Sequence, residues 1–464
     1  MKTHFNQLKN RVIDILTEYS RFSDLSIVYP DFLSIYTLIC LTNDGLLDDF
    51  DKSKVSELLN NKYEGIDLKL NDLYGYIENR YTELNGVFSR IDTSSYSSKY
   101  AQDRSNRIYN LLVELSHLDV SVYDGTCGKI YNELLDYISK SSGKKAADFY
   151  TPMSVRKLLI EVISPEENKT IYDPVCGAGG FLIQANDYIK SRGGYSEGSY
   201  FYGQEINSST WQIAKQNLLV NNLFNSCIHL GNTLVNPENM NPDGQMKKFD
   251  YVIANPPFSL KKWDAGHDFS NDLRFKYGIP PRNSADFAFV LHCLSSIKEN
   301  GKAVIVVSPG SLFRMGVEGK IRQRLIEENV IETIIALPSN LFHGTSIAPN
   351  ILILNKAKES EDIAFIDASG HYREQTHLNT LEEDHISLIL SLYKEKRNLK
   401  DFCEVVSKEQ ILVKENGVLS VSSYVKKDHF HKVEESFSDL QAKQVSLTNR
   451  LTQLEEEMLK LIKS

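Results

Sequence analysis

Hydrophobic residues follow a helical spacing through the first part of the chain. Apolar side chains recur every three or four positions in the opening segment, and the spacing returns near residue 110. A spacing of this kind places apolar side chains on one face of an α-helix. We therefore expect a helical N-terminal domain over residues 1–144, ending in a Ser/Gly/Lys connector at 141–145. The pattern is carried by Phe5, Leu8, Val12, Ile15, Leu16, Tyr19, Ile108, Leu111, Leu112 and Leu115.

The pattern changes at about residue 170. Short β-rich runs, each followed by a turn signal, now alternate with helical stretches. Strands that alternate with helices predict an α/β fold with a mainly parallel sheet, in which ligands bind at the carboxyl ends of the strands. We assign this sheet to a domain over residues 145–405. The predicted strands lie at 170–172, 200–202, 227–230, 251–254, 303–307, 331–336 and 351–354.

The last thirty or so residues show a third spacing of hydrophobic residues. Mostly apolar residues recur every seven positions, and a second set fills the complementary position of each heptad. This pattern predicts a coiled-coil helix within a C-terminal tail over residues 406–464. A helix that packs on its own domain is the alternative. The two sets are Val433, Leu440, Leu447, Leu454 and Leu461, and Phe437, Gln444, Leu451 and Met458.

Composition narrows the class of protein. Hydrophobic residues at 41% and charged residues at 24% are ordinary for a folded soluble chain. The apolar runs are shorter than a membrane span, and the N-terminus lacks a signal peptide's apolar region. The six cysteines are scattered without a C-x-x-C pair, which argues against a zinc site or a disulfide framework. We expect a cytoplasmic protein with no metal and no membrane contact.

The net charge of −9 restricts how the chain could bind nucleic acid. A protein that grips DNA unaided presents a basic surface, because neutralisation of phosphates carries most of the affinity. An acidic chain therefore either does not bind nucleic acid or binds it through a local patch and a partner.

A glycine-rich turn follows the first predicted strand. Glycines let the backbone turn tightly and approach a ligand closely, and the following helix offers free amides at its N-terminus. The spacing matches neither G-x-x-x-x-G-K-[ST] nor G-x-G-x-x-G, so neither phosphate-binding fingerprint fits. A purely structural turn is the alternative. The segment is Asp173-Pro174-Val175-Cys176-Gly177-Ala178-Gly179-Gly180-Phe181.

An acidic residue, Glu205, ends the second predicted strand. A carboxylate at this position can accept both hydroxyls of a ribose, as in dinucleotide-binding folds. The alternative is a solvated surface glutamate, and the preceding glycine-rich turn favours the ligand.

The tetrapeptide Asn255-Pro256-Pro257-Phe258 follows the fourth predicted strand. Two successive prolines fix φ twice and remove two backbone donors. The Asn255 side-chain oxygen and the Pro256 carbonyl are then rigidly held acceptors, suited to the two hydrogens of an exocyclic amine. Phe258 offers a flat apolar face on which a planar base can stack. The tetrapeptide therefore indicates chemistry on the amino group of a base.

Asn255–Phe258 resembles the [DNS]-P-P-[YFW] motif of amino-group methyltransferases, and the glycine-rich turn resembles their cofactor loop. The segment Phe149-Tyr150-Thr151-Pro152, upstream of that loop, resembles the cofactor-contacting segment of the gamma arrangement. Over roughly residues 105–430 the chain is similar to the modification (HsdM) subunit of type I restriction–modification systems. Further segments that fit are 128–133, 272–278, 284–292, 304–309 and 419–425.

The resemblance implies a seven-stranded, mostly parallel, doubly wound sheet whose last strand is antiparallel. It implies that the chain methylates the N6 amino group of adenine in double-stranded DNA from S-adenosylmethionine, after the adenine has left the base stack. The implied partners are a specificity subunit, on which the heptad tail would dock, a second copy of the chain and a restriction subunit. The implied catalytic residues are Asn255, Pro256, Pro257 and Phe258, and the implied cofactor-binding residues are Tyr150, Thr151, Pro152, Asp173, Gly177, Ala178, Gly179, Gly180, Glu205 and Asn232.

Three alternatives remain open on the sequence. A solitary methyltransferase of DNA, RNA or protein can carry a similar tetrapeptide. An N4-cytosine methyltransferase differs little in chemistry, although serine is more usual at the position of Asn255. A catalytically silent assembly subunit is the third, and the intact tetrapeptide argues against it.

Overall fold

The computed structural model describes most of the chain, and residues 1–425 form one compact unit. The predicted coiled-coil segment at 433–461 lies outside the described residues, as do residues 142–149 of the connector and of the segment before the cofactor loop. The described residues are 2–22, 25–44, 46–60, 65–91, 98–141, 150–195, 198–342, 344–375 and 378–426.

The N-terminal region consists of helices, which confirms the helical periodicity. In α1, Val12 and Leu16 are fully buried, and other apolar residues of the stripe, such as Phe5 and Leu8, are partly buried. The helix α2 is mostly apolar and lies in the middle of the group, against α1, α5 and α6. The helices are α1 (Lys2–Tyr19), α2 (Leu25–Asn43), α3 (Asp49–Asn60), α4 (Ile66–Arg80), α5 (Ser98–Ser116) and α6 (Thr126–Ser141), with short 3-10 helices η1 (Ser20–Phe22) and η2 (Thr82–Leu84).

A single mixed sheet of nine strands forms the second region, in the order β3-β2-β1-β4-β5-β7-β6-β8-β9. The strands β3, β2, β1, β4 and β5 are parallel neighbours, whereas β7 runs antiparallel between β5 and β6. The strands are β1 (Thr170–Asp173), β2 (Tyr200–Glu205), β3 (Ser226–Leu230), β4 (Phe249–Ala254), β5 (Ile297–Val307), β6 (Ile331–Ala336), β7 (Asn350–Asn355), β8 (Ile363–Asp367) and β9 (Cys403–Val406).

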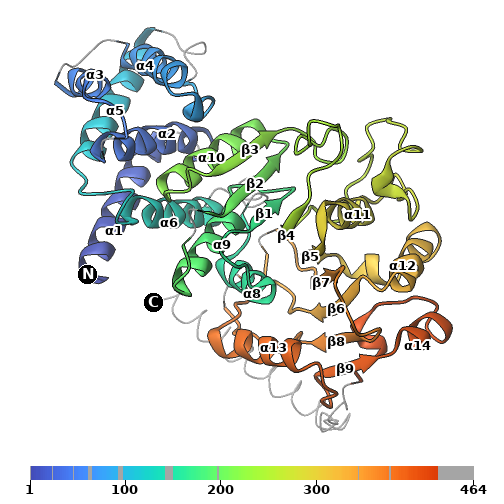
Figure 1. Cartoon of the computed structure of the whole chain (residues 1–464). Helices are drawn as coiled ribbons and strands as arrows, with labels where there is room; N and C mark the ends of the chain where they lie inside the picture. Colours follow the sequence, from blue (N-terminus) through green and yellow to red (C-terminus); the bar gives the residue numbers. More distant parts are fainter. Residues whose placement is uncertain are drawn as a thin grey trace, which may run out of the picture. The chain divides into compact units, whose positions relative to one another are not determined.

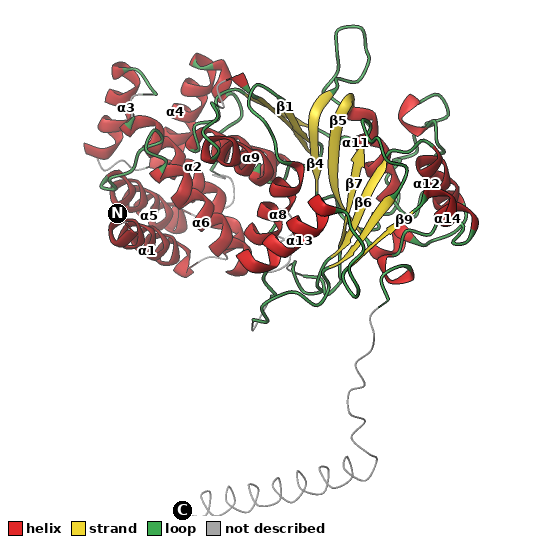
Figure 2. Cartoon of the chain, turned by 60° about the horizontal axis from the view of Figure 1, so that its bottom comes forward, coloured by secondary structure: helices red, strands yellow, loops and turns green. Residues whose placement is uncertain are grey.

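Helices cover both faces of the sheet. Figures 1 and 2 show α8, α9 and α13 on one side and α11, α12 and α14 on the other. Successive strand residues such as Ile171 and Tyr172 belong to different apolar layers, because neighbouring side chains in a strand point to opposite faces. The helices are α8 (Met153–Ile163), α9 (Gly180–Ser191), α10 (Ser208–Val220), α11 (Asp286–Ser296), α12 (Val317–Glu327), α13 (Glu383–Glu395) and α14 (Lys408–Val413), with 3-10 helices η4 (Leu273–Phe275), η5 (Pro309–Leu312) and η6 (Val421–Ser423).

The helix α10 joins the N-terminal helices to the sheet. It packs on α2 and α6 on one side and on β2 and β3 on the other (Figure 1). The buried side chain of Gln216 accepts a hydrogen bond from the Tyr131 hydroxyl (2.7 Å) and donates to Ser34 Oγ (2.9 Å) and to the Val87 carbonyl (2.8 Å). Because these bonds satisfy a buried amide, they hold the N-terminal helices in a defined position beside the sheet.

The predicted sheet needs a correction. All seven predicted strands are present as β1 to β7, but the sheet has nine strands, because β8 pairs in parallel with β6 and β9 pairs antiparallel with β8. All neighbouring strands are therefore parallel only from β3 to β5, and the other half of the sheet is mixed. The strand β8 contains a run of only four apolar residues before Asp367, and the periodicity of so short a run does not distinguish a strand from a helix segment. The edge strand β9 is only four residues long and contains Glu404, so its sequence gives a weaker signal still.

Among the residues that the structure describes, every helix is too short or too polar to span a bilayer.

Candidate active site

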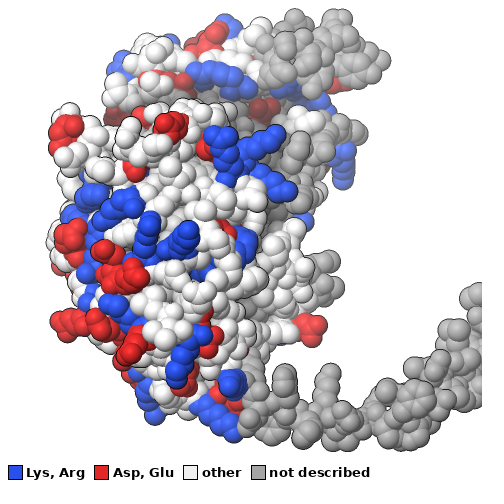
Figure 3. Space-filling model, turned by 90° about the vertical axis from the view of Figure 1, so that its right-hand side faces the viewer, with Lys and Arg blue, Asp and Glu red and all other residues white. Residues whose placement is uncertain are grey.

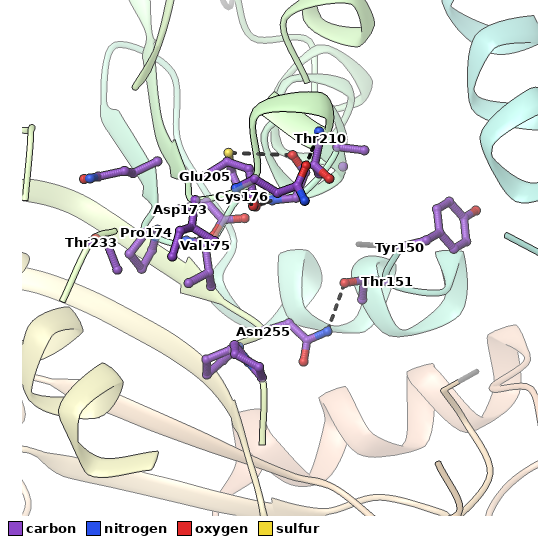
Figure 4. Close-up of a pocket in the computed structure, with 18 of the residues that line it drawn as sticks. Tyr150, Thr151, Asp173, Pro174, Val175, Cys176, Glu205, Thr210, Thr233 and Asn255 are labelled. Carbon is purple, nitrogen blue, oxygen red and sulfur yellow. Dashed lines mark hydrogen bonds between the residues drawn. The ribbon is translucent and has the colours of Figure 1, made fainter. Parts of the chain in front are cut away.

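A cavity of about 750 Å³ opens at the carboxyl ends of β1, β2 and β4, where the α/β pattern predicts a ligand. The residues that follow these strands all line it, together with Tyr150 and Thr151 from the segment before α8 (Figure 4). Tyr29 of α2 and Leu135 of α6 also line it, so the N-terminal helices contribute part of the wall.

Most of the predicted site residues line this one cavity. Pro152 and Gly179 do not line the cavity, and each lies where the backbone enters a helix. Pro152 is the residue before the first turn of α8, and Gly179 is the residue before α9. The residues that line the cavity are Tyr150, Thr151, Asp173, Gly177, Ala178, Gly180, Glu205, Asn232, Asn255, Pro256, Pro257 and Phe258.

The glycine-rich turn adopts a conformation that other residues rarely take. Gly177 has φ +52° and Gly179 has φ +77°, both in the left-handed region. The Gly179 amide donates to the Cys176 carbonyl (2.8 Å), which closes the turn and starts α9. The side chains of the described residues provide no cap for the α9 amides, and its first turn carries no acidic residue. This helix N-terminus is therefore available to a negatively charged group.

Two carboxyl groups, Asp173 and Glu205, lie at the ends of adjacent parallel strands. Asp173 Oδ1 accepts the Val175 amide (3.0 Å), and burial raises the pKa of Asp173 to about 8, with a smaller contribution from Glu205. Burial also raises the pKa of Glu205 above its ordinary value, although its oxygens accept the amides of Gly177 (3.1 Å) and Asn207 (2.8 Å). A ligand with a positive group and hydroxyl donors would stabilise the ionised form of both.

Asn232 follows β3 on the same edge of the sheet. Its Oδ1 accepts the amides of Leu234 (3.0 Å) and Val235 (3.4 Å), so the side chain closes a tight turn. The described residues offer no hydrogen-bond acceptor to its Nδ2 group. Asn232 can therefore donate one hydrogen bond into the cavity while it holds the loop in place.

The Asn255 side chain is oriented by Thr151. Asn255 Nδ2 donates to Thr151 Oγ1 across 3.0 Å (Figure 4). No described residue donates to Asn255 Oδ1, so this oxygen is an acceptor left for a ligand. The segment that contains Thr151 and the tetrapeptide are about a hundred residues apart in the chain, and the fold brings them together at one wall of the cavity.

The loop after the tetrapeptide is held by Asp286 at the start of α11. The Ser259 amide, at φ +51°, donates to Asp286 Oδ1 (3.0 Å). Asp286 Oδ2 accepts from Ser284 and Ser308 and forms an ion pair with Arg314. The ring of Phe258 meets Phe342 edge to face, with centroids 6.4 Å apart. These contacts hold the ring of Phe258 beside Asn255 Oδ1 and the Pro256 carbonyl.

Two further residues near the site have structural roles. His292 is fully buried, contacts the Tyr172 hydroxyl (3.1 Å) and Arg274 (3.2 Å), and burial lowers its pKa, so it is a neutral, hydrogen-bonded core histidine. Burial raises the pKa of the Cys176 thiol well above its ordinary value, so this side chain is an apolar filler of the turn. Neither is placed as a base or a nucleophile.

The cavity also contains residues that sequence reasoning did not single out, and Ile206 and Arg156 are two of them. Ile206, directly after Glu205, is 66% exposed and lines the cavity, so it offers an apolar surface beside the carboxylate. Its place directly after Glu205 was the one feature of the sequence that could have identified Ile206 as a cavity residue. Arg156 also lines the cavity, but α8 is an amphipathic helix in sequence and gives no sign that a cation points inward.

The described residues contain no cluster of three or more histidine, cysteine, aspartate or glutamate side chains able to hold a metal ion.

A family model described as N-6 DNA Methylase matches residues 123–433, which is more than half of the chain. The chain belongs to the N-6 DNA methylase family. The matched range includes the segment before α8, the glycine-rich turn and the tetrapeptide, so the family relationship covers every wall of the cavity except that of Tyr29.

Relatives of this N-6 DNA methylase have been named in several organisms. The type I restriction enzyme MpnII methylase subunit of Mycoplasma pneumoniae is 31% identical, over 79% of this chain and 71% of the relative. The HindI methylase subunit of Haemophilus influenzae is 29% identical, over 78% of this chain and 84% of the relative. A type I restriction-modification methyltransferase subunit from Streptococcus thermophilus has a similar structure, with TM-score 0.80, 27% identity and coverage of 91% of this chain and 99% of that one.

Proposed function

We propose that this N-6 DNA methylase transfers a methyl group from S-adenosylmethionine to the N6 amino group of adenine in DNA, as the modification subunit of a type I complex. The observation that carries the proposal is the free Oδ1 of Asn255, held in the same cavity as Asp173 and Glu205. An acceptor for an amine thus adjoins a pocket for a cationic, ribose-containing ligand. The relatives named as type I methylase subunits support the same assignment.

The cavity fits S-adenosylmethionine on the chemistry of its donors and acceptors. We assign the ribose hydroxyls to Glu205, the adenine to Asn232, and the methionine part to the wall formed by Tyr150, Thr151 and Asp173 with the turn from Gly177 to Gly180. A positive charge on the ligand would offset the burial that raises the pKa of Asp173 and of Glu205. When bound, the cofactor supplies an electrophilic methyl group.

The residues around the tetrapeptide act by positioning. Asn255 Oδ1 and the Pro256 carbonyl accept the two hydrogens of the adenine amino group, which turns its lone pair away from the ring plane. Pro257 keeps the backbone rigid, and Phe258 stacks on the base after it has left the duplex. Thr151 holds the Asn255 amide in the orientation that presents oxygen to the base. Positioning of this kind requires no separate general base.

Recognition of the DNA sequence is assigned to a partner. The chain has a net charge of −9. On the face shown in Figure 3, Lys and Arg side chains are interspersed with Asp and Glu rather than gathered into one basic surface. Unaided binding to DNA is therefore disfavoured. We propose a specificity subunit as the partner that reads double-stranded DNA, with a second copy of this chain and a restriction subunit as further members of the complex.

The boundaries inferred from the sequence remain part of the proposal. They divide the chain into a helical region to residue 144, a methyltransferase region over 145–405 and a tail over 406–464 whose heptads dock on the specificity subunit.

The proposal can be tested in cells that lack endogenous adenine methylation. The chain is expressed with a cognate specificity subunit, and nucleosides from the genomic DNA are analysed by mass spectrometry. N6-methyladenine should appear in the cells with the wild-type chain and be strongly reduced with Asn255→Ala. N4-methylcytosine, or methylation at the wild-type level in the variant, would contradict the assignment.

A further inference from the structure

Arg156 is a buried cation without a carboxylate partner. It lies in the second turn of α8, and only 3% of its surface is exposed. Its Nη2 donates to the Tyr150 hydroxyl (3.2 Å), and its guanidinium lies 5.1 Å from the centre of the Tyr150 ring. Its Nε has no hydrogen-bond partner. Among the described side chains no acid forms an ion pair with it, and Asp187 interacts with it only at longer range, together with Lys129 and Lys190.

Buried charges are ordinarily paired, because an unpaired charge loses its hydration without compensation. The hydrogen bond and the ring contact with Tyr150 do not neutralise the guanidinium, because this tyrosine is neutral. Arg156 therefore has unused capacity to bind a negative group, and the cavity that it lines is the place from which such a group can reach it.

Gly180 brings the guanidinium to the N-terminus of α9. A Cβ atom at Gly180 would lie 2.6 Å from Arg156 Nη1 and 3.0 Å from its Cδ, so a larger residue would displace the arginine side chain. The first turn of α9 has no acidic side chain and no side-chain cap. A cation and the free amides of a twelve-residue helix thus meet at one point of the cavity wall.

The charges of the cavity decide which anion fits. Asp173 and Glu205 line the same cavity, and a bare phosphate would leave both carboxyl groups without a cationic partner. A group that carries a carboxylate and an ammonium together satisfies both sets of residues, with the carboxylate at Arg156 and the ammonium at the acids. An α-amino acid has this pair of charges.

We infer that Arg156, with the N-terminus of α9, binds the α-carboxylate of the methionine part of S-adenosylmethionine. The inference rests on the proposed function, since it names a residue for one group of the proposed cofactor. Tyr150 acts as a positioning residue, because its hydroxyl and ring hold the guanidinium against Gly180. Arg156 thereby makes the site selective for adenosyl compounds that keep the carboxylate.

The test compares S-adenosylmethionine with decarboxylated S-adenosylmethionine, which lacks only the carboxylate, by isothermal titration calorimetry on the full chain. The wild type should bind the decarboxylated compound more weakly by on the order of 10- to 100-fold, as expected for the loss of a charge-assisted hydrogen bond. Arg156→Met should weaken S-adenosylmethionine by a similar factor and change the decarboxylated compound by less than about threefold. Arg156→Lys should retain part of the discrimination, because it keeps the charge without the planar fork.

Lys157→Met is the matched control. Lys157 is the next residue of α8, pairs with Glu383 on the surface and does not line the cavity, so this variant should discriminate like the wild type. Equal affinity of the wild type for the two compounds would overturn the inference, and this measurement needs no variant to fold. Equal weakening of both compounds by Arg156→Met would also overturn it. If the wild type binds neither compound, the proposed function fails as well, whereas binding without discrimination refutes Arg156 alone.

Discussion

Asn255 Nδ2 donates a hydrogen bond to Thr151 Oγ1 across 3.0 Å, and this contact ties the tetrapeptide after β4 to the segment before α8. An asparagine amide can rotate by half a turn and present nitrogen instead of oxygen. In the structure the nitrogen donates to Thr151 Oγ1, and the oxygen is directed to the ligand. The contact places the acceptor for the amine directly beside the segment before α8.

Replacement of Thr151 should slow methyl transfer. Thr151→Val removes the acceptor but keeps the shape, and the loss of one neutral hydrogen bond predicts a fall in kcat of about tenfold. Thr151→Ser keeps a hydroxyl and should restore most of the rate. Single-turnover kinetics with the assembled complex would measure both variants. A valine variant as fast as the wild type would show that the hydroxyl does not matter and would contradict this role of Thr151.

Removal of the acceptor itself should have a larger effect. Asn255→Ala removes one of the two acceptors for the amino group and should lower kcat on the order of 100-fold or more. Calorimetry should show unchanged affinity for S-adenosylmethionine. Full methylation by Asn255→Ala would contradict the mechanism.

The aromatic ring at Phe258 should contribute stacking. Phe258→Ala should weaken binding of the flipped base by roughly 1–3 kcal/mol, and Phe258→Trp should retain much of it. Phe224→Ala provides a control, since Phe224 is an exposed phenylalanine outside the cavity. Equal losses in the alanine and tryptophan variants would argue against stacking.

Asp173 should make the stability of the free protein depend on pH. Burial raises its pKa to about 8, from a value near 4 in an unfolded chain. An acid with a raised pKa in the folded state favours folding below the unfolded pKa, and this contribution is lost as pH rises through the folded pKa. Between pH 4 and 8, the unfolding free energy of the wild type should therefore fall relative to that of Asp173→Asn. Denaturant titrations at several pH values would show it, and parallel curves for the two proteins would refute it.

The loop after the tetrapeptide should depend on Asp286. Asp286→Asn weakens the ion pair with Arg314, and we expect a loss of about 2 kcal/mol of stability, since Arg314 is partly exposed. The rate of methylation should fall, whereas affinity for S-adenosylmethionine should not change, because Asp286 does not line the cavity. Denaturant unfolding and calorimetry measure the two properties separately. A large fall in cofactor affinity would show a wider role for this residue.

The strand ends and their motifs could be predicted because each depends on a short stretch of sequence. The turn from Asp173 to Gly180, Glu205 and the tetrapeptide at Asn255 all follow strands whose apolar runs are clear. Their convergence follows from a parallel sheet, in which the carboxyl ends of strands share an edge. The prediction of all seven strands from β1 to β7 has the same basis.

What could not be predicted depends on contacts between distant segments. The strands β8 and β9 are short, and only their pairing with β6 and with each other identifies them. The hydrogen bond between Thr151 and Asn255 and the position of Arg156 against Gly180 join residues far apart in the chain. A sequence without structure gives no sign of which way such side chains point.

The most direct test of the central claim is methyl transfer in a purified system. The chain, alone or assembled with its specificity subunit, is incubated with S-adenosylmethionine and duplex DNA that contains the target sequence, and the modified nucleosides are identified by mass spectrometry. The assembled complex should form N6-methyladenine, and neither the chain alone nor the complex with Asn255→Ala should do so. Transfer to cytosine, RNA or protein, or efficient site-specific methylation by the chain alone, would contradict the account.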